Sequence, residues 1–475
     1  MNKNVLLLLV GIAAGQAGCT MAPKYARPEA PVPAEWPVYQ AAPPTPIASD
    51  VALLHWQDFF ADQNLQRIIA AALKNNRDLR LAALNVERAR ALYGVQRAEL
   101  FPVVNAVVSG GKERVPADLS GIGKPLTVKQ VEAGLGLSSW EIDFFGRIRS
   151  LSDAALQEYF ATEQASRSTQ ILLVSEVANA YLTLAADRET LKLAGTTLEA
   201  QQAAYDLVKR RLDRGYVPEL DLFRAQTQVD AARRDIARYT QQVAQDENAL
   251  DLLVGAPVPD DLLPAELGGV SPLKEISPGV SSEVLLSRPD IHEAEAYLKA
   301  ANANIGAARA AFFPRISLTA AIGTGSADLS GLFKSGSGAW SFAPQIVAPI
   351  FDARAWSALK VTEIDKKSAI AQYEKAIQTA FREVADALAV RGTVDQQVSA
   401  QESLVHAAAE TYRLSSTRYI KGIDNYLSVL DAQQSLYAAQ QRLVAIRWGK
   451  LANQVRLYAV LGGGWQPEPA APASR

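Results

Sequence analysis

The chain has 475 residues but only one cysteine, two methionines and three histidines. A single cysteine cannot form a disulfide within the chain and cannot build a cysteine-based metal site. The histidines, His55, His292 and His406, are far apart, and no acidic residues accompany them in the spacing of a metalloprotease motif. The sequence therefore predicts no metal centre and no cofactor.

An excess of charge of one sign is also absent, because 48 Lys and Arg face 50 Asp and Glu, for a formal net charge of −2. Nucleic acid binding requires a concentrated basic surface, so no nucleic acid partner is expected. The chain has no G-x-S-x-G nucleophile motif, no phosphate-binding loop and no dinucleotide fingerprint. We therefore expect no enzymatic activity.

The N-terminus carries a secretory signal, in which Lys3 precedes the apolar run VLLLLVGIAA and small residues lead to Gly18 and Cys19. A run this short does not span a membrane, which requires about 20 apolar residues. We predict a signal peptide at residues 1–18 and acylation of Cys19, as in bacterial lipoproteins. Thr20 follows in place of the aspartate that resembles an inner-membrane retention signal, which favours the outer membrane. An ordinary signal peptide with an incidental cysteine is the alternative.

The body of the chain is a tandem duplication. Residues 73–104 align with residues 285–316 at a constant offset of 212, and each segment carries Phe-Pro near its end, at residues 101–102 and 313–314. Further along, the segment that begins at Glu176 returns at Glu383, an offset of 207. Two similar halves predict an assembly with rotational symmetry.

Long segments without proline predict unusually long helices. Residues 147–213 and 354–420 contain no proline and are interrupted chiefly by Gly195 and Gly392. Their apolar residues recur at gaps of three and four in a narrow stripe, which is typical of helices packed as in coiled coils. A short glycine turn and a returning helix follow each segment, which predicts two helical hairpins. We assign helices to residues 56–101 and 285–312, and long hairpins with breaks to residues 146–255 and 353–462.

Between the helices of each half the hydrophobic pattern changes to a period of two. The alternation is clear at residues 127–140 and 315–325, and segments 102–110 and 339–350 are also consistent with strands. We predict β-hairpins at 102–140 and 313–350. Strands of about 9–11 residues with one apolar face and one polar or small face match an outer-membrane barrel.

Four strands cannot close a barrel, and an open sheet edge in hydrocarbon costs several kcal/mol for each unsatisfied backbone group. The chain must therefore borrow strands from copies of itself. Eight strands are filled by their own side chains, whereas twelve begin to leave a lumen, so transport favours a homotrimer. A small soluble sandwich beside a coiled-coil rod is the alternative. The remaining segments are a proline-rich lipidated tether at 19–55, a linker at 256–284 and a tail at 463–475.

Several motifs support one resemblance. They are the segments AELFP, ARAAFFP, SWEIDFFGRIRS, PIFDARAW, VLDAQQSLYAAQ and LYAVLGGGW. Together they resemble the outer membrane factors of bacterial tripartite efflux and secretion systems, the TolC-like proteins, and look most like the OprM-type multidrug efflux lipoproteins. The resemblance runs from about Cys19 to Trp465.

The resemblance implies a mainly α fold with a transmembrane β part: a trimeric twelve-stranded β-barrel continued by a long periplasmic α-helical barrel. The tip would dock to a periplasmic adaptor and an inner-membrane pump of the RND type. The implied function is passive exit of drugs or other small molecules through the outer membrane, from a duct that is lipid-anchored, spans the outer membrane and projects into the periplasm. A duct for type I protein secretion and a non-conducting coiled-coil lipoprotein of the envelope are the alternatives.

The resemblance also implies that the hairpin turns, around Gly215 and Gly422, close the periplasmic end and dock the adaptor. In a threefold assembly each aspartate near the turns becomes a ring of three carboxylates, which attracts cations. Bonds from Tyr419 or Arg418 to an acidic group of the neighbouring hairpin, such as Asp221, would hold the tip shut. The chain has Ser428 where TolC has an acidic residue and Asp424 where it has a basic one, so that charge pattern does not transfer directly. The candidate gate residues are Asp221, Arg418, Tyr419, Asp424, Leu427 and Asp431.

Overall fold

The computed structural model describes residues 20–37, 54–271, 273–274 and 281–463. The predicted signal peptide, Cys19, the later part of the tether and almost all of the C-terminal tail lie outside the described residues. The chain divides into two compact units. The sheet unit comprises the residues up to Glu29, 85–162 and 293–373, and the helical unit comprises 30–84, 163–292 and the residues from Glu374 onward.

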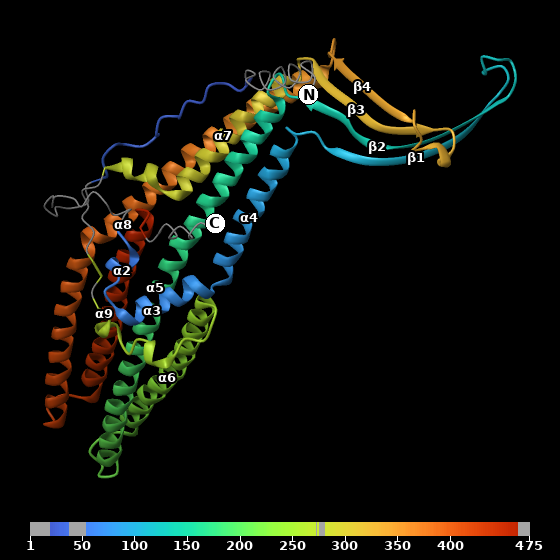
Figure 1. Cartoon of the computed structure of the whole chain (residues 1–475). Helices are drawn as coiled ribbons and strands as arrows, with labels where there is room; N and C mark the ends of the chain where they lie inside the picture. Colours follow the sequence, from blue (N-terminus) through green and yellow to red (C-terminus); the bar gives the residue numbers. More distant parts are fainter. Residues whose placement is uncertain (1–19, 38–53, 272, 275–280, 464–475) are drawn as a thin grey trace. The chain divides into compact units, whose positions relative to one another are not determined.

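The described part of the chain is mostly helical, with one small sheet (Figure 1). In chain order the elements are α2 (Trp56–Phe59), α3 (Gln63–Asn75), α4 (Arg77–Ala98), β1 (Val104–Val115), β2 (Leu126–Ile142), α5 (Arg147–Leu212), α6 (Glu219–Val254), η3 (Asp260–Leu262), η4 (Leu267–Gly269), η5 (Ser282–Ser287), α7 (Pro289–Ala310), β3 (Arg315–Ser326), η6 (Leu329–Gly331), β4 (Gly338–Val347), α8 (Ala353–Ile420) and α9 (Tyr426–Val460). The order α4, β1, β2, α5, α6 returns as α7, β3, β4, α8, α9. The prediction of a mainly helical, duplicated chain with a small β part is confirmed.

The expected breaks in the long helices are absent. α5 is one helix of 66 residues that continues through Gly195, and α8 is one helix of 68 residues that continues through Gly392. A glycine inside a helix costs only about 1 kcal/mol relative to alanine. Ala194 and Val208 of the same helix, one before and one after Gly195, are fully buried. Their packing offsets a cost of this size. None of the described helices has an apolar stretch long enough to cross a membrane.

The sheet has four antiparallel strands in the order β1-β2-β3-β4, so β2 and β3 join the two halves of the chain (Figure 1). The strands approach closely at Gly134, where an added Cβ would lie 2.6 Å from the carbonyl oxygen of Ile322. A β-bulge interrupts the pairing between Leu137 and Trp140. In the described residues, β1 and β4 each have a neighbour on one side only.

The two faces of the sheet differ in polarity, because paired residues in an antiparallel sheet point to the same face. The apolar face includes Val108 at 76% exposure, Ile322 at 69% and Trp340 at 80%. The opposite face carries small and polar residues. They include Asn105, Ser109, Gln130, Glu132, Gly134, Gly136, Thr319, Ala321, Gly323, Ser341, Ala343 and Gln345.

The N-terminal strap, residues 20–37, contains no helix or strand but is held against other elements. In the sheet unit, Glu295 of α7 accepts hydrogen bonds from the Tyr25 hydroxyl at 3.0 Å and from Arg27 Nε and Nη2 at 3.0 and 2.6 Å. Lys299 Nζ lies 3.2 Å from the same carboxylate, whose side chain is only 4% exposed. Asn302 also donates a hydrogen bond to the Pro23 carbonyl.

In the helical unit, the strap continues along η5 and α8. Ser282 donates a hydrogen bond to the Pro33 carbonyl at 2.7 Å, and Trp36 stacks on Phe381 with ring centroids 4.7 Å apart. The proline-rich segment is thus extended, as proline content predicts, and is bound along the part that the structure describes.

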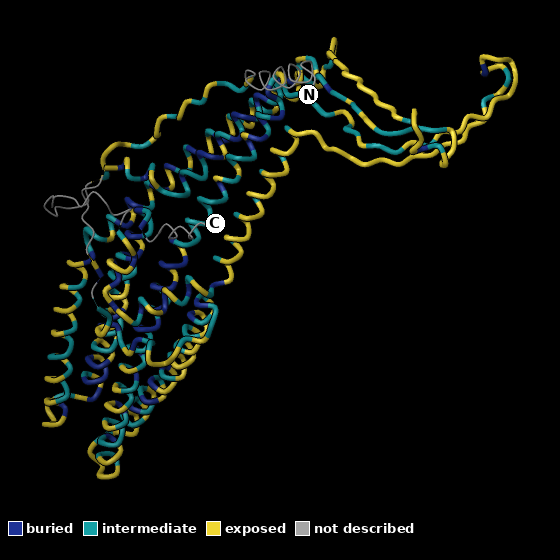
Figure 2. Tube along the Cα trace, in the orientation of Figure 1, coloured by how far each residue is buried: buried dark blue, intermediate teal, exposed yellow. Residues whose placement is uncertain are grey.

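The core of the helical unit begins with α2 and α3. Phe59 stacks on Tyr458 of α9 with ring centroids 4.1 Å apart. α3 buries Leu65, Ile68, Ile69 and Ala72, a spacing that puts all four on one helix face. By contrast, α4 has no buried residue and is exposed along its length (Figure 2).

Candidate functional site

The tips of the two helical hairpins use the same turn. Gly215 has φ +73° and donates its N–H to the Leu212 carbonyl after the end of α5. Gly422 has φ +74° and donates its N–H to the Tyr419 carbonyl after the end of α8. Glycine adopts this left-handed conformation without steric cost, which is why it ends helices so often. Each tip is therefore a tight, sequence-encoded reversal.

The two tips share one apolar cluster within the helical unit. Tyr419 from α8 and Tyr426 from α9 lie in contact, with ring centroids 5.3 Å apart. Burial is the main reason why the pKa of Tyr426 rises to about 12, so its phenol stays neutral. Partly buried residues of both hairpins surround this centre. The buried members of the cluster are Val208, Ala225, Tyr419, Tyr426, Val429 and Leu430.

Arg211, near the end of α5, joins the first tip to the second. Its Nη1 and Nη2 donate to the carbonyls of Tyr419 and Ile420 at 3.3 and 3.0 Å. Its guanidinium carbon also lies 4.7 Å from the centre of the Tyr419 ring. The last carbonyls of a helix carry partial negative charge, so a cation is favourable there. The sequence prediction missed Arg211, although Arg418 is its counterpart at the offset of 207.

Arg418 makes a different contact. It donates from Nε and Nη2 to the Asp424 carboxylate of its own turn, at 2.5 and 3.1 Å. These hydrogen bonds lower the pKa of Asp424 below its usual range. Asp221 pairs with Arg224 of its own helix, at 3.6 Å. The bond expected between Arg418 and Asp221 is therefore not formed in this structure.

The remaining predicted gate residues lie on the same tips. The Tyr419 hydroxyl is buried and has no hydrogen-bond partner among the described residues. Leu427 is 42% exposed, and Asp431 is exposed on α9. The predicted tip residues thus lie at the ends of the two hairpins, and Tyr419 belongs to the apolar cluster that the hairpins share. Cys19 lies outside the described residues.

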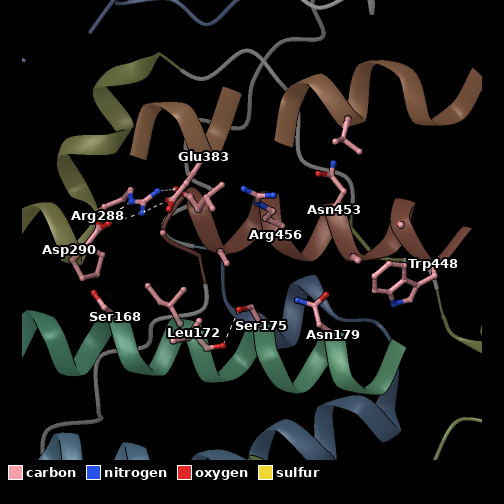
Figure 3. A pocket seen from close by; sticks show the side chains of 18 residues that line it. Ser168, Leu172, Ser175, Asn179, Arg288, Asp290, Glu383, Trp448, Asn453 and Arg456 are labelled. Carbon is pink, nitrogen blue, oxygen red and sulfur yellow. Dashed lines mark hydrogen bonds and ion pairs between the residues drawn. The ribbon is translucent and has the colours of Figure 1, made fainter. Parts of the chain in front are cut away.

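A cavity of about 640 Å³ lies in the helical unit between α5 and α9 (Figure 3). At one end Arg288 forms ion pairs with Asp290 at 2.7 Å and with Glu383 at 3.0 Å. Burial opposes the charge of Arg288, yet its two carboxylate partners raise its pKa above the usual range. Asp290 and Glu383 both lie in the duplicated segments of the sequence. No sequence pattern, however, predicted that Arg288 forms ion pairs with both of them.

The cavity wall offers polar groups but no reactive pair. Ser168 Oγ and Asn179 Oδ1 line it without hydrogen-bond partners in the described residues. Figure 3 shows both on α5, opposite Trp448 and Arg456 of α9. In the described part of the chain, no three His, Cys, Asp or Glu side chains are placed to hold a metal ion.

Comparisons with known proteins agree with one another. The family model described as outer membrane efflux protein matches residues 68–256 and 280–463, once in each half. The toluene efflux pump outer membrane protein TtgC of Pseudomonas putida is 49% identical over 469 residues, which cover 98% of this chain and 96% of that protein. The outer membrane protein OprJ of Pseudomonas aeruginosa is 42% identical over 463 residues, which cover 97% of this chain and 96% of OprJ.

Solved structures resemble the chain over nearly its whole length. A membrane protein from Pseudomonas aeruginosa superimposes with a TM-score of 0.89 at 41% identity and covers 96% of this chain and 100% of its own. The open state of the MtrE outer membrane channel of Neisseria gonorrhoeae gives a TM-score of 0.84 at 37% identity and covers 94% of this chain and 98% of its own.

Proposed function

The chain belongs to the outer membrane efflux protein family, and on this premise we propose that it is the outer-membrane exit duct of a tripartite efflux system. The duct conducts small molecules passively and performs no chemistry. Relatives named for toluene and antibiotic efflux favour small molecules over secreted proteins as cargo. The same names support a partnership with an inner-membrane pump, which we propose to be of the RND type, through a periplasmic adaptor.

The observation that carries this proposal is the four-stranded sheet. One face exposes large apolar side chains, among them Trp340 at 80% and Val108 at 76%, which suits contact with lipid. The other face is small and polar, which suits a water-filled lumen. The outer edges of β1 and β4 are open in the described residues, and open edges in lipid leave backbone groups unsatisfied. Three copies supply twelve strands, enough to leave a lumen.

We place the gate and the adaptor-docking surface at the hairpin tips around Gly215 and Gly422. The tips are compact, because one apolar cluster and Arg211 hold both hairpins of a chain together. Threefold symmetry would turn Asp221 and Asp431 into rings of carboxylates, which favour cations. Arg418, Tyr419, Asp424 and Leu427 complete the proposed gate. Acylation of Cys19 would add a lipid anchor to the membrane-spanning strands.

Ion conductance of the purified protein in planar lipid bilayers tests the proposal. We expect the native protein to conduct with a preference for cations. The double variant Asp221→Ala, Asp431→Ala should conduct more and lose much of that preference. Asp230→Ala is the matched control, because Asp230 is an exposed carboxylate on α6 whose partners among the described residues are nearby side chains of its own helix.

The outcome that contradicts the proposal is a native protein and a double variant that both fail to conduct. A trimer without conductance would instead favour the coiled-coil lipoprotein of the envelope. A conducting channel whose expression leaves drug efflux unchanged would favour the duct for protein secretion.

A further inference from the structure

The first β-hairpin, formed by β1 and β2, carries a cluster of cations where it extends beyond the rest of the sheet. β1 and β2 remain paired up to their turn, whereas the pairing of β2 with β3 stops at Val131 and Ser326 (Figure 1). In the extension, Lys112 of β1 lies directly opposite Lys129 of β2, and Arg114 follows two positions after Lys112. These three exposed residues, Lys112, Arg114 and Lys129, are called the basic patch below.

The basic patch continues the apolar face of the sheet. Alternate residues of a strand share a face, and residues paired across an antiparallel ladder do so too. Lys112 and Arg114 therefore lie on the same face as Val108, and Lys129 lies on that face because it pairs with Lys112. The carboxylates of β1 and β2 all belong to the opposite face, although one of them lies between Lys112 and Arg114 in the sequence. They are Glu113, Glu132 and Glu141.

The positive charge of the basic patch is not balanced within the chain. Lys112 and Arg114 have no carboxylate partner among the described residues. Lys129 lies 3.5 Å from Asp328, but both side chains are more than half exposed, and such a surface pair contributes little. Like charges directly opposite each other destabilise a sheet. An anion bound at this face would remove the repulsion between Lys112 and Lys129.

The position of the basic patch along the strand indicates where this anion lies. Lys112 follows Val104, the first residue of β1, by eight positions, a distance of about 27 Å at about 3.4 Å per residue. Strands of outer-membrane barrels tilt by about 35–45°, so this distance spans about 20 Å of a lipid-facing band about 25 Å tall. Lysine and arginine also extend their charged ends past apolar surface. The patch therefore reaches the level of the lipid headgroups, on the face that meets lipid and next to the turn of the hairpin.

We propose that the basic patch binds the phosphate groups of a phosphorylated glycolipid in the outer leaflet of the membrane. Arginine donates two parallel hydrogen bonds to a phosphate, and lysine binds phosphate as a point charge. Thr127 is paired with Arg114 and adds a hydroxyl to the same face. The inference rests on the proposed function, because the patch meets headgroups only if the sheet spans the membrane.

The second hairpin, formed by β3 and β4, has no such patch. At the offset of 212, Lys112 corresponds to Thr324, and the partner of Thr324 on β4 is Gly338. The counterpart of the Lys112 and Lys129 pair is thus uncharged. The basic patch is therefore not a consequence of the duplication, and the second hairpin supplies a control within the same chain.

Titration of the purified full-length protein with bisphosphorylated lipid A, followed by native mass spectrometry, tests the proposal. One basic side chain near an anionic lipid surface strengthens binding about fivefold. Lys112→Gln with Lys129→Gln should therefore weaken lipid A binding about 25-fold. The matched control, Lys124→Gln with Lys334→Gln, removes the same charge from exposed positions in the two hairpin turns. This control should bind lipid A within about threefold of the native protein.

Two comparisons separate a lipid phosphate from a free anion and from net charge. Lipid A without its phosphates should bind the native protein about as weakly as bisphosphorylated lipid A binds the Lys112 and Lys129 double variant. A large excess of inorganic phosphate should not displace bisphosphorylated lipid A. Displacement by inorganic phosphate would overturn the lipid as the partner, and an equal loss of binding in both double variants would overturn the patch as the site.

Ion conductance keeps this inference separate from the proposed function. The patch side chains are exposed, so the Lys112 and Lys129 double variant should keep the mass of the native complex and its conductance. A conducting double variant that binds lipid A as tightly as the native protein refutes only the lipid site. A native protein that never conducts refutes the duct on which the lipid site rests.

Discussion

Replacement of Glu295 by alanine should release the N-terminal strap from α7. The Glu295 carboxylate is 4% exposed and receives hydrogen bonds from Tyr25 and Arg27 and an ion pair from Lys299. Burial alone would raise the pKa of Glu295, but hydrogen bonds from Arg27, Tyr25 and Lys299 lower it below the usual range. The Glu295 carboxylate is therefore ionised and accepts hydrogen bonds from the strap. The counterpart in the first half is Ala83 on α4, so alanine is compatible with this helix.

The size of the effect follows from burial. Removing one partner of a buried ion pair costs about 3–5 kcal/mol. Arg27 is 47% exposed and regains water when its partner is lost, so we expect a smaller loss of about 2–3 kcal/mol. Since about 1.4 kcal/mol corresponds to a factor of ten, the open strap should become about 30–150 times more populated.

Trypsin cleavage between Lys24 and Tyr25 measures that population. When opening is fast relative to cleavage, the cleavage rate follows the fraction of open strap. Cleavage at this bond in Glu295→Ala should therefore accelerate about 30–150-fold, as followed by mass spectrometry of the intact protein. Glu29→Ala removes an exposed carboxylate of the strap itself and should change the rate little. A change of less than about threefold in Glu295→Ala, or the same change in both variants, would refute the reasoning.

Three further outcomes are expected. Burial and the neighbouring Asp187 carboxyl raise the pKa of Asp246 from 3.8 to about 7, so between these values the folded chain holds a proton that the unfolded chain has released. Stability therefore falls as the pH rises from about 4 to 7. Asp246→Asn should raise the free energy of unfolding at pH 8 by about 1–2 kcal/mol, a value that is reduced because the carboxyl is partly exposed. At pH 4 the same variant should gain little. If denaturant titrations showed the same increase in the free energy of unfolding at pH 4 and pH 8, the raised pKa of Asp246 would be contradicted. Arg211→Ala should raise the ion conductance of the purified protein several-fold because the tips lose their mutual contact, while Arg210→Ala, at an exposed neighbour, should not. Equal conductance in both variants would remove Arg211 from the gate. Cys19→Ser should lower the mass of the mature N-terminus by its acyl chains, and an unchanged lipid mass would refute acylation.

The sequence predicted those parts of the fold that depend on local pattern and on repetition. Both glycine turns and both β-hairpins follow from residue types whose preferences act within a few positions, as at Gly215 and Gly422. The prediction of breaks in the long helices was wrong, since α5 continues through Gly195. A single glycine destabilises a helix by less free energy than the surrounding packing contributes. Local propensity is a weak guide where neighbouring turns are buried.

The tip shows the same limit for side-chain contacts. Arg211 reaches carbonyls about two hundred residues away in the sequence, and only the packing of α5 against α8 brings them together. Arg418 was expected to reach Asp221, but Asp424 lies six positions away on the same turn. The nearer carboxylate requires less ordering of the chain and therefore forms the pair. The sequence thus indicated which charged residues lie at the tip, whereas their hydrogen-bond partners depended on the three-dimensional structure.

The strap also constrains the order in which the chain folds. Tyr25 and Arg27 bind a carboxylate 268 to 270 residues further along, which does not exist until most of the polypeptide has been synthesised. Closing so long a loop early is entropically unfavourable, and the binding surface itself requires a completed α7. The N-terminal end must therefore remain loose during most of biogenesis. Its attachment is a late event, which distinguishes a finished protomer from an incomplete one.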